Sequence, residues 1–140
     1  MYIFYILELY SVVILNMYSL QQRFLLFLIG CIGSRTLFAM IAKTIDAQYL
    51  PILGYIALLP AIGFLYIFIT GSRQTGLEVG GGKIWWNGLR PLHSILYFLF
   101  AYNAIHHHTY AWKFLAIDVI IGFVAFLTHH YSEGNLSKLL

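Results

Sequence analysis

The chain has 140 residues, of which 61% are hydrophobic, 18% are aromatic and only 9% are charged. Soluble domains are about 45–50% apolar, and a water-soluble fold of this size could not bury so much apolar surface. The net charge of +3 comes from eight basic residues spread along the chain, which indicates membrane topology and no nucleic-acid partner. The composition therefore predicts an integral membrane protein.

Five apolar stretches are each long enough for one helical crossing, which takes about 20 residues. They cover residues 2–20, 24–43, 51–71, 91–110 and 112–131. The first stretch is interrupted by Glu8 and several small polar residues, so it is also compatible with a helix lying along the membrane surface. We predict an all-α integral membrane helical bundle with four to five transmembrane helices, forming a single membrane domain over residues 1–140.

The long polar loop, residues 72–90, separates the third and fourth stretches and sets the orientation. With five crossings, this loop shares one face with residues 21–23 and the C-terminal tail. That face carries Arg23, Arg73, Lys83, Arg90 and Lys138, whereas the opposite face carries only Lys43 and Lys113. The positive-inside rule then places the loop and the C-terminus in the cytosol. If the first stretch does not cross, the N-terminal segment also lies on the cytosolic side.

Three ionisable residues, Glu8, Arg35 and Asp118, fall within the apolar stretches. At 1.5 Å per residue, each lies about 9–12 Å from the non-cytosolic end of its helix, so the three share one layer. Charges in hydrocarbon usually pair inside the bundle. We predict that Arg35 pairs with Asp118, with Glu8 nearby. Such a cluster is either an ion pair that fixes the register of the helices or a proton, ion or anion site.

Six histidines raise the question of a metal site. If the last two helices are antiparallel, His93 lies beside His129 and His130 on the cytosolic side, and residues 106–108 lie at the opposite surface. Three histidines can hold zinc with an open position, but adjacent helical residues point about 100° apart, and interfacial histidines with solvated tips are the plainer interpretation. We predict no metal and no cofactor, with these three histidines as the candidates that a metal would need.

The end of the polar loop has the most distinctive composition in the chain. Its paired tryptophans suit a membrane interface, its basic residues can meet lipid phosphates, and Pro91 restarts a helix. We predict an interfacial anchor made of Lys83, Trp85, Trp86 and Arg90, with docking of a partner protein as the alternative. A second pattern, the stripe of small residues at Gly54, Ala57 and Ala61, predicts close packing of the third helix against the second.

The runs 30–35, 70–73 and 83–93 resemble small multi-span proteins encoded by large double-stranded DNA viruses of algae and protists. The similarity covers most of residues 30–131, and its most specific parts are Trp85-Trp86-Asn87 and the Arg-Pro-x-His pattern that ends at His93. That group has no established activity, so the resemblance assigns no catalytic residue. It implies a viral origin and a place in a host membrane or an internal virion membrane.

Three functions follow from these patterns. The first is a non-enzymatic structural or assembly protein of a viral or host membrane, whose partners are the lipid bilayer and either further copies of the chain or other membrane or virion proteins. The alternative is a small oligomeric ion or proton channel, or a transporter, that uses Glu8, Arg35 and Asp118. A membrane enzyme with a histidine-bound metal is the third, and the histidine spacing disfavours it.

Overall fold

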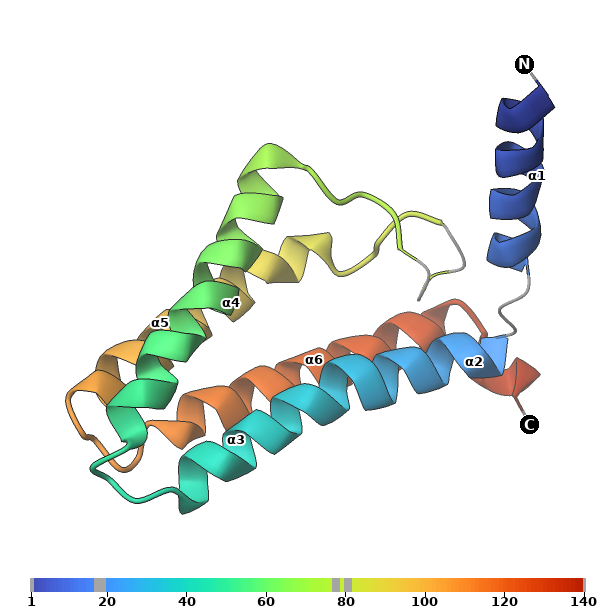
Figure 1. Ribbon diagram of the computed structural model, residues 1–140. Coiled ribbons are helices and arrows are strands. Elements are labelled where there is room, and N and C mark those ends of the chain that lie inside the picture. The colour runs from blue at the N-terminus through green and yellow to red at the C-terminus, as the bar shows by residue number, and fades with distance from the viewer. Residues whose placement is uncertain (1, 17–19, 77–78, 80–81, 140) are drawn as a thin grey trace.

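The structure is a computed structural model that describes residues 2–16, 20–76, 79 and 82–139 (Figure 1). All secondary-structure elements among these residues are helices, which confirms the predicted all-α class. In chain order the elements are α1 (Tyr2–Asn16), α2 (Leu20–Leu25), the π-helix η1 (Leu26–Gly33), α3 (Ser34–Thr44), α4 (Leu50–Thr70), the 3₁₀-helix η3 (Asn87–Leu89), α5 (Arg90–Ile105), α6 (Trp112–Ser132) and the 3₁₀-helix η4 (Leu136–Lys138).

Three helices are long and apolar enough to cross a membrane. The first is the continuous run of α2, η1 and α3 over Leu20–Thr44, and the others are α4 and α6. Helix α1 has 15 residues and α5 has 16, so they measure about 22 and 24 Å, which is short of a hydrocarbon core of about 30 Å. Of the four to five transmembrane helices predicted from the sequence, three thus have the length and composition of a crossing within the described residues. Residues 17–19 of the first predicted stretch lie outside those residues.

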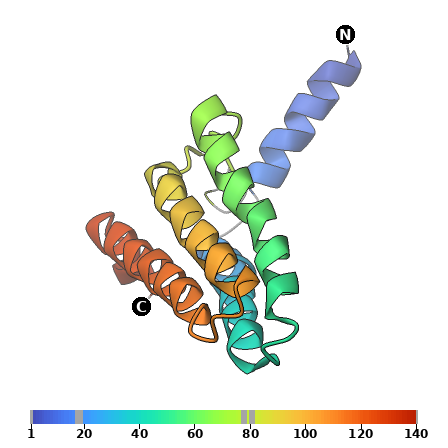
Figure 2. The same ribbon diagram turned by 90° about the vertical axis from the view of Figure 1, so that its left-hand side faces the viewer.

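The helices form two antiparallel pairs that meet at one end and diverge at the other (Figures 1 and 2). The continuous Leu20–Thr44 helix lies beside α6, and α4 lies beside α5. At the meeting end, His107 Nδ1 donates a hydrogen bond to the Ala47 carbonyl at 3.0 Å. There the Lys43 ammonium also lies 4.8 Å from the centre of the Trp112 ring, which is a cation–π distance. The first contact joins the two loops at that end, and the second joins the end of α3 to the start of α6.

Close packing of α4 on α5 depends on small residues. Ala57 and Ala61 are fully buried, and a Cβ on Gly54 would lie only 3.0 Å from the Ala101 carbonyl oxygen of α5. The Ser94 hydroxyl of α5 donates to the Ala61 carbonyl at 2.7 Å. The small-residue stripe therefore faces α5, whereas the sequence predicted the second helix as its partner.

An aromatic cluster fills the space near the diverging end. Phe24 of α2 and Phe27 of η1 pack against Phe126 of α6. The rings of Phe27 and Phe126 stack with their centres 4.8 Å apart. The returning loop adds Trp85, whose ring stacks on that of His129 at 4.4 Å. The loop thus folds back onto the first helix pair.

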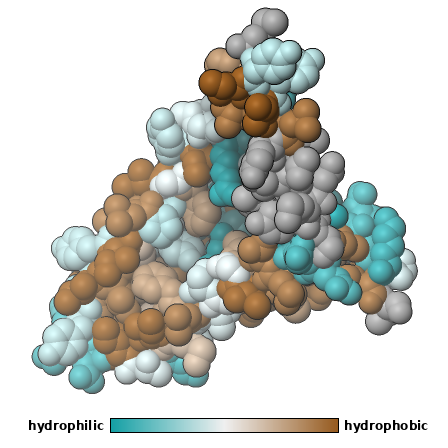
Figure 3. Space-filling view, turned by 45° about the vertical axis from the view of Figure 1, so that its right-hand side comes forward, coloured by the Kyte–Doolittle hydropathy of each residue, from teal (hydrophilic) through white to brown (hydrophobic). Residues whose placement is uncertain are grey.

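Apolar side chains cover much of the outer face of the helices, and hydrophilic residues gather towards their ends (Figure 3). Large exposed hydrophobic residues occur on every long helix, including Leu59 at 73% and Ile29 at 69% exposure. Such a surface is compatible with a lipid environment, where apolar side chains need no cover. Helix α1 stands apart from the two pairs in Figure 1, and its residues 2–9 are exposed.

Candidate functional site

A buried polar cluster joins three helices of the bundle. It consists of Arg35 from α3, His93 from α5 and Asp118 from α6. One guanidinium nitrogen of Arg35, Nη1, lies 3.2 Å from Asp118 Oδ2, and His93 Nδ1 lies 2.5 Å from Asp118 Oδ1. The carboxylate is therefore shared between a guanidinium on one side and an imidazole on the other.

The chemistry of the carboxylate fixes the role of the imidazole nitrogen. An ionised carboxylate only accepts hydrogen bonds, so His93 Nδ1 carries the hydrogen that it donates to Asp118. Arg35 Nη1 also lies 3.3 Å from this nitrogen, but two donors cannot bond to each other, so that approach is a contact. Both donors of the cluster are thus directed at Asp118.

The cluster is almost closed to its surroundings. Asp118 has no exposed surface and His93 is 3% exposed, whereas the Arg35 side chain keeps 12% of its surface accessible. The ring of Phe64, from α4, lies 5.0 Å from the Arg35 guanidinium carbon, which adds a cation–π contact on its open side. All four long helices of the two pairs therefore meet at this cluster.

Gly122 gives the cluster its space on α6. A Cβ at this position would lie 3.2 Å from Ile32 Cδ1, 3.8 Å from Arg35 Nη1 and 3.9 Å from His93 Cε1. The first distance is tighter than normal packing, so even an added methyl group would push Ile32, whereas the Arg35 and His93 side chains lie at ordinary contact distance. This glycine permits the approach of α3 and α5 to the same turn of α6.

The structure brings together Arg35 and Asp118 from the predicted cluster, but it does not bring Glu8 to them. Glu8 is an exposed residue of α1, and α1 points away from the helices that carry the pair (Figure 1). His93 takes the third position. The sequence-based prediction placed His93 on the cytosolic side, away from the layer of Arg35 and Asp118. The only signal for its role was a histidine inside an apolar stretch.

The predicted grouping of His93 with His129 and His130 differs from the structure. The prediction paired a helix ending at residue 110 with one starting at 112, which places residue 93 opposite residue 129. Helix α5 in fact ends at Ile105, so the same count from Trp112 reaches residue 124 in place of residue 129. The actual contact of His93 is with Asp118, which is still further from His129 along α6. Among the described residues, no three His, Cys, Asp or Glu side chains come together as a metal site would require.

The four residues of the predicted interfacial anchor take different places. Lys83 is exposed, and Trp85 and Trp86 are half-buried. Trp86 packs on Phe27, with ring centres 5.4 Å apart. Arg90 is only 3% exposed, and its Nη1 donates to Asn87 Oδ1 at 2.7 Å and to the Arg73 carbonyl at 3.1 Å. Both tryptophans and Arg90 thus take part in holding the loop on the bundle.

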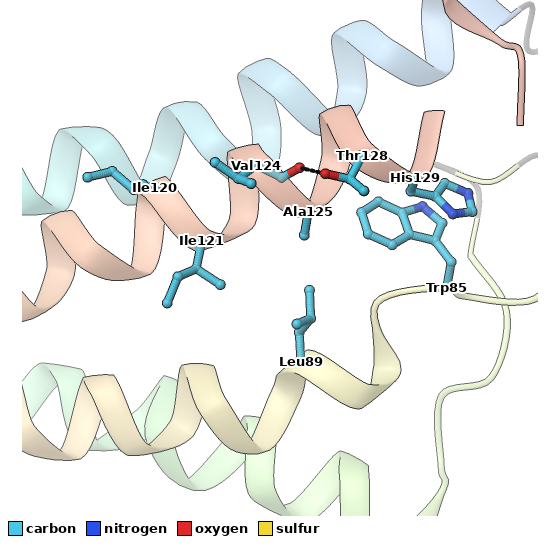
Figure 4. A pocket seen from close by; sticks show the side chains of 8 residues that line it. All are labelled: Trp85, Leu89, Ile120, Ile121, Val124, Ala125, Thr128 and His129. Atoms are coloured by element: carbon cyan, nitrogen blue, oxygen red, sulfur yellow. Dashed lines mark hydrogen bonds between the residues drawn. The ribbon is translucent and has the colours of Figure 1, made fainter. Parts of the chain in front are cut away.

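Two pockets open between the diverging helix pairs. One has a volume of about 570 Å³ and is mainly apolar, and Figure 4 shows it between α6 and the segment that precedes α5, with Trp85 and His129 stacked at one end. The other has a volume of about 460 Å³ and is lined by residues that include Arg35, Arg73 and Arg90. We call the second one the arginine pocket.

The π-helix η1 forms a wall of the arginine pocket, and no sequence pattern predicted it directly. Leu26, Phe27, Gly30 and Cys31 all belong to η1 and line the pocket. At its end the Ser34 hydroxyl donates to the Gly30 carbonyl at 2.6 Å. Two glycines followed by a serine mark a run of weak helix propensity. Such departures from α-helical bonding are frequent at functional sites.

Removal of one charge from the buried pair should destabilise the fold strongly, because the partner is left buried and uncompensated. We expect Arg35→Gln and Asp118→Asn each to cost about 3–5 kcal/mol. The double variant should lose less than the sum, by about 0.5–3 kcal/mol. Unfolding titrations in detergent micelles measure these free energies. The exposed charges of Lys113 and Asp46, changed to Gln and Asn, serve as the control pair. Additive losses for Arg35 and Asp118 would contradict an energetic coupling.

The molecule is thus a helical protein with three helices long and apolar enough to cross a membrane among its described residues, and with a buried Arg–His–Asp cluster formed by α3, α5 and α6. No protein-family model matches the chain, and comparisons with curated proteins and with solved structures found no match.

Proposed function

We propose that the chain is a non-enzymatic, multi-pass integral membrane protein with a structural or assembly role. The observation that supports this most is the burial of the Arg35–His93–Asp118 cluster, in which each residue comes from a different helix. Ionisable side chains at membrane depth are costly unless they are paired. Their mutual satisfaction therefore selects one arrangement of α3, α5 and α6 over the alternatives.

Four crossings follow from the way in which α5 is built. Helix η3 directly precedes α5 and adds three residues, at about 2 Å each, to the 24 Å of α5. The combined element reaches about 30 Å, which matches the hydrocarbon core. It lies antiparallel to α4, as a returning crossing would. We assign α1, whose 15 described residues are fewer than a crossing needs, to the cytosolic surface.

The orientation in this proposal rests on the ends of the helices. Arg23 and Lys83 line a pocket together with His129 and Asn135. Helix α2, the long loop and the end of α6 therefore lie at the same end of the bundle. Lys43 lies at the other end beside Trp112. The positive-inside rule then assigns the loop and the C-terminus to the cytosol.

Cysteine labelling tests this topology. In a Cys31→Ser background, Ala47→Cys and Ser137→Cys place single thiols at exposed positions of opposite ends. A membrane-impermeant maleimide added to intact cells should label Ala47→Cys only, and permeabilisation should add Ser137→Cys. Tyr2→Cys, which is 86% exposed, should behave like Ser137→Cys. Labelling of Ser137→Cys in intact cells would reverse the orientation, and labelling of Tyr2→Cys there would give α1 a crossing of its own.

A flux assay separates this proposal from the channel or transporter. A conducting site needs a polar route across the membrane, but Asp118 has no exposed surface and Glu8 lies away from the cluster. In liposomes carrying a proton gradient, we expect wild-type protein to dissipate the gradient at the rate of protein-free liposomes. A faster rate that Asp118→Asn abolishes would establish conduction through the cluster and overturn the structural assignment.

The membrane and the partners are a further part of the proposal. The resemblance to small proteins of large DNA viruses supports a place in a host membrane or an internal virion membrane, next to copies of the chain or other virion proteins. We expect the chain in purified virus particles and its loss when detergent strips their lipid. Its absence from particles, judged by mass spectrometry against a known membrane component, would exclude the virion location.

A further inference from the structure

We propose that the loop between α5 and α6 binds a Cu²⁺ ion through the Nε2 atoms of His106 and His108. The sequence places residues 106–108 at the surface opposite the long loop and predicts no metal in the chain, so the site goes beyond that prediction. Residues 99–110, which build it, are all described by the structure. The proposal also goes beyond the structural role proposed above and does not depend on the topology.

The way in which α5 ends brings two imidazole rings near each other. In a helix that continued past Ile105, residues 106 and 108 would point about 200° apart. The helix stops there, and His107 has a left-handed backbone with a φ of 59°, at a position where glycine is usual. The rings of His106 and His108 instead have their centres 6.2 Å apart, with 30° between their planes. Strained backbone of this kind is concentrated at functional sites.

A hydrogen bond sets His106 in the state that a metal ligand needs. Its Nδ1 lies 2.7 Å from the Tyr102 carbonyl oxygen, which only accepts hydrogen bonds, so this nitrogen carries the hydrogen. In a neutral imidazole the other nitrogen, Nε2, then has the lone pair. Metal-bound histidines usually donate their second ring N–H to a carbonyl oxygen in this way.

A buried asparagine sets the same state in His108. Asn103 is 8% exposed, and its Nδ2 donates to the Leu99 carbonyl at 2.8 Å. Its Oδ1 lies 3.0 Å from His108 Nδ1. Because an amide oxygen only accepts, His108 Nδ1 carries the hydrogen and Nε2 has the lone pair. The Tyr110 hydroxyl, 3.2 Å from the same nitrogen, is then a second acceptor.

The separation of the two rings suits a shared ion. With a metal–nitrogen bond of about 2.1 Å, and the ring centre about 1.1 Å beyond it, two rings on one ion have centres at most about 6.4 Å apart. The observed 6.2 Å is within that limit. Both Nδ1 atoms are bonded to acceptors in the last turn of α5, so both Nε2 atoms point away from it. Both side chains are exposed, which leaves them open to an ion from solution.

The number and type of ligands favour copper. Among divalent ions, Cu²⁺ binds a given set of nitrogen and oxygen ligands most tightly, and it takes tetragonal sites. Zinc sites use four protein ligands, or three with one open position. Within the described part of the chain, no third His, Cys, Asp or Glu joins these two histidines in a metal site. A Cu²⁺ ion would complete its coordination with water.

His107 offers a matched control between the two ligands. Its Nδ1 donates to the Ala47 carbonyl of the other loop, so its side chain is committed to a different contact. Asparagine also adopts the left-handed backbone, so His107→Asn removes one imidazole and keeps the turn. His106→Asn and His108→Asn make the same change at the ligands, and both positions are exposed.

Copper titration of the full chain in detergent micelles, with electron paramagnetic resonance, tests the site. In a Cys31→Ser background, which removes the thiol as a competitor, we expect one Cu²⁺ per chain with two coordinated imidazoles, and weaker binding of Zn²⁺. Asn103→Leu should weaken Cu²⁺ binding about 10–100-fold, the usual cost of losing a group that orients a metal-bound histidine. His106→Asn and His108→Asn should each weaken it at least as much, and His107→Asn should leave it unchanged.

Several results would overturn the proposal. A spectrum with one coordinated imidazole would show that the rings do not share an ion. Equal losses in all three asparagine variants would mean adventitious binding to a run of histidines only. Zinc bound as tightly as copper would remove the choice of metal, and wild-type affinity in Asn103→Leu would remove the role of the buried amide. Because binding in micelles is independent of orientation, none of these results bears on the proposed topology.

Discussion

The fold depends on the need to neutralise Asp118 inside an apolar bundle. The carboxylate is fully buried, and an unpaired charge in such a place would cost more than any single apolar contact returns. Arg35 and His93 approach it from two different helices, so the arrangement of these helices is constrained by one side chain. Apolar packing alone would be far less selective, because helices covered with leucine, isoleucine and phenylalanine can pack in many registers that bury similar areas.

The divergence of the two helix pairs determines where the pockets of the protein lie. Contacts between loops, such as that of His107 with Ala47, hold the pairs together at one end. At the other end, the bulky side chains of Trp85, Trp86, Phe27 and Phe126 fill only part of the space, and pockets remain on both sides of them. The buried cluster lies between the closed end and these pockets. Arg35 and Phe64 line the arginine pocket and also contribute to the cluster, so the pocket borders the polar centre of the bundle.

Much of the helical organisation was predictable, because long apolar runs ended by polar residues have one plain interpretation. The second, third and fifth predicted stretches match the observed helices to within a few residues. The contact of Arg35 with Asp118 followed from depth along two helices. The end of α5 could not be predicted in this way, because residues 104–111 include enough apolar side chains to extend a helix. The turn that ends the helix there has a left-handed backbone at His107. Because this turn was missed, the prediction placed His93 of α5 opposite His129 and His130, several turns along α6 from its actual partner Asp118.

The π-helix could not be predicted from periodicity either, since its wider turn changes which residues share a face. The inward position of Arg90 and the tryptophans depends on a loop that returns to the bundle. That return depends on contacts between residues far apart in sequence, such as those of Trp86 with Phe27 and of Trp85 with His129. Composition identified these residues as suited to an interface, but it could not show which side of the helices they would contact.

The position of Cys31 has a practical consequence. It is the sole cysteine of the chain, it is partly accessible, and it belongs to the wall of the arginine pocket. A fluorophore or spin label attached to this native thiol would therefore sense the polarity and crowding of the pocket directly. The wild-type sequence thus contains its own site-specific reporter of pocket occupancy.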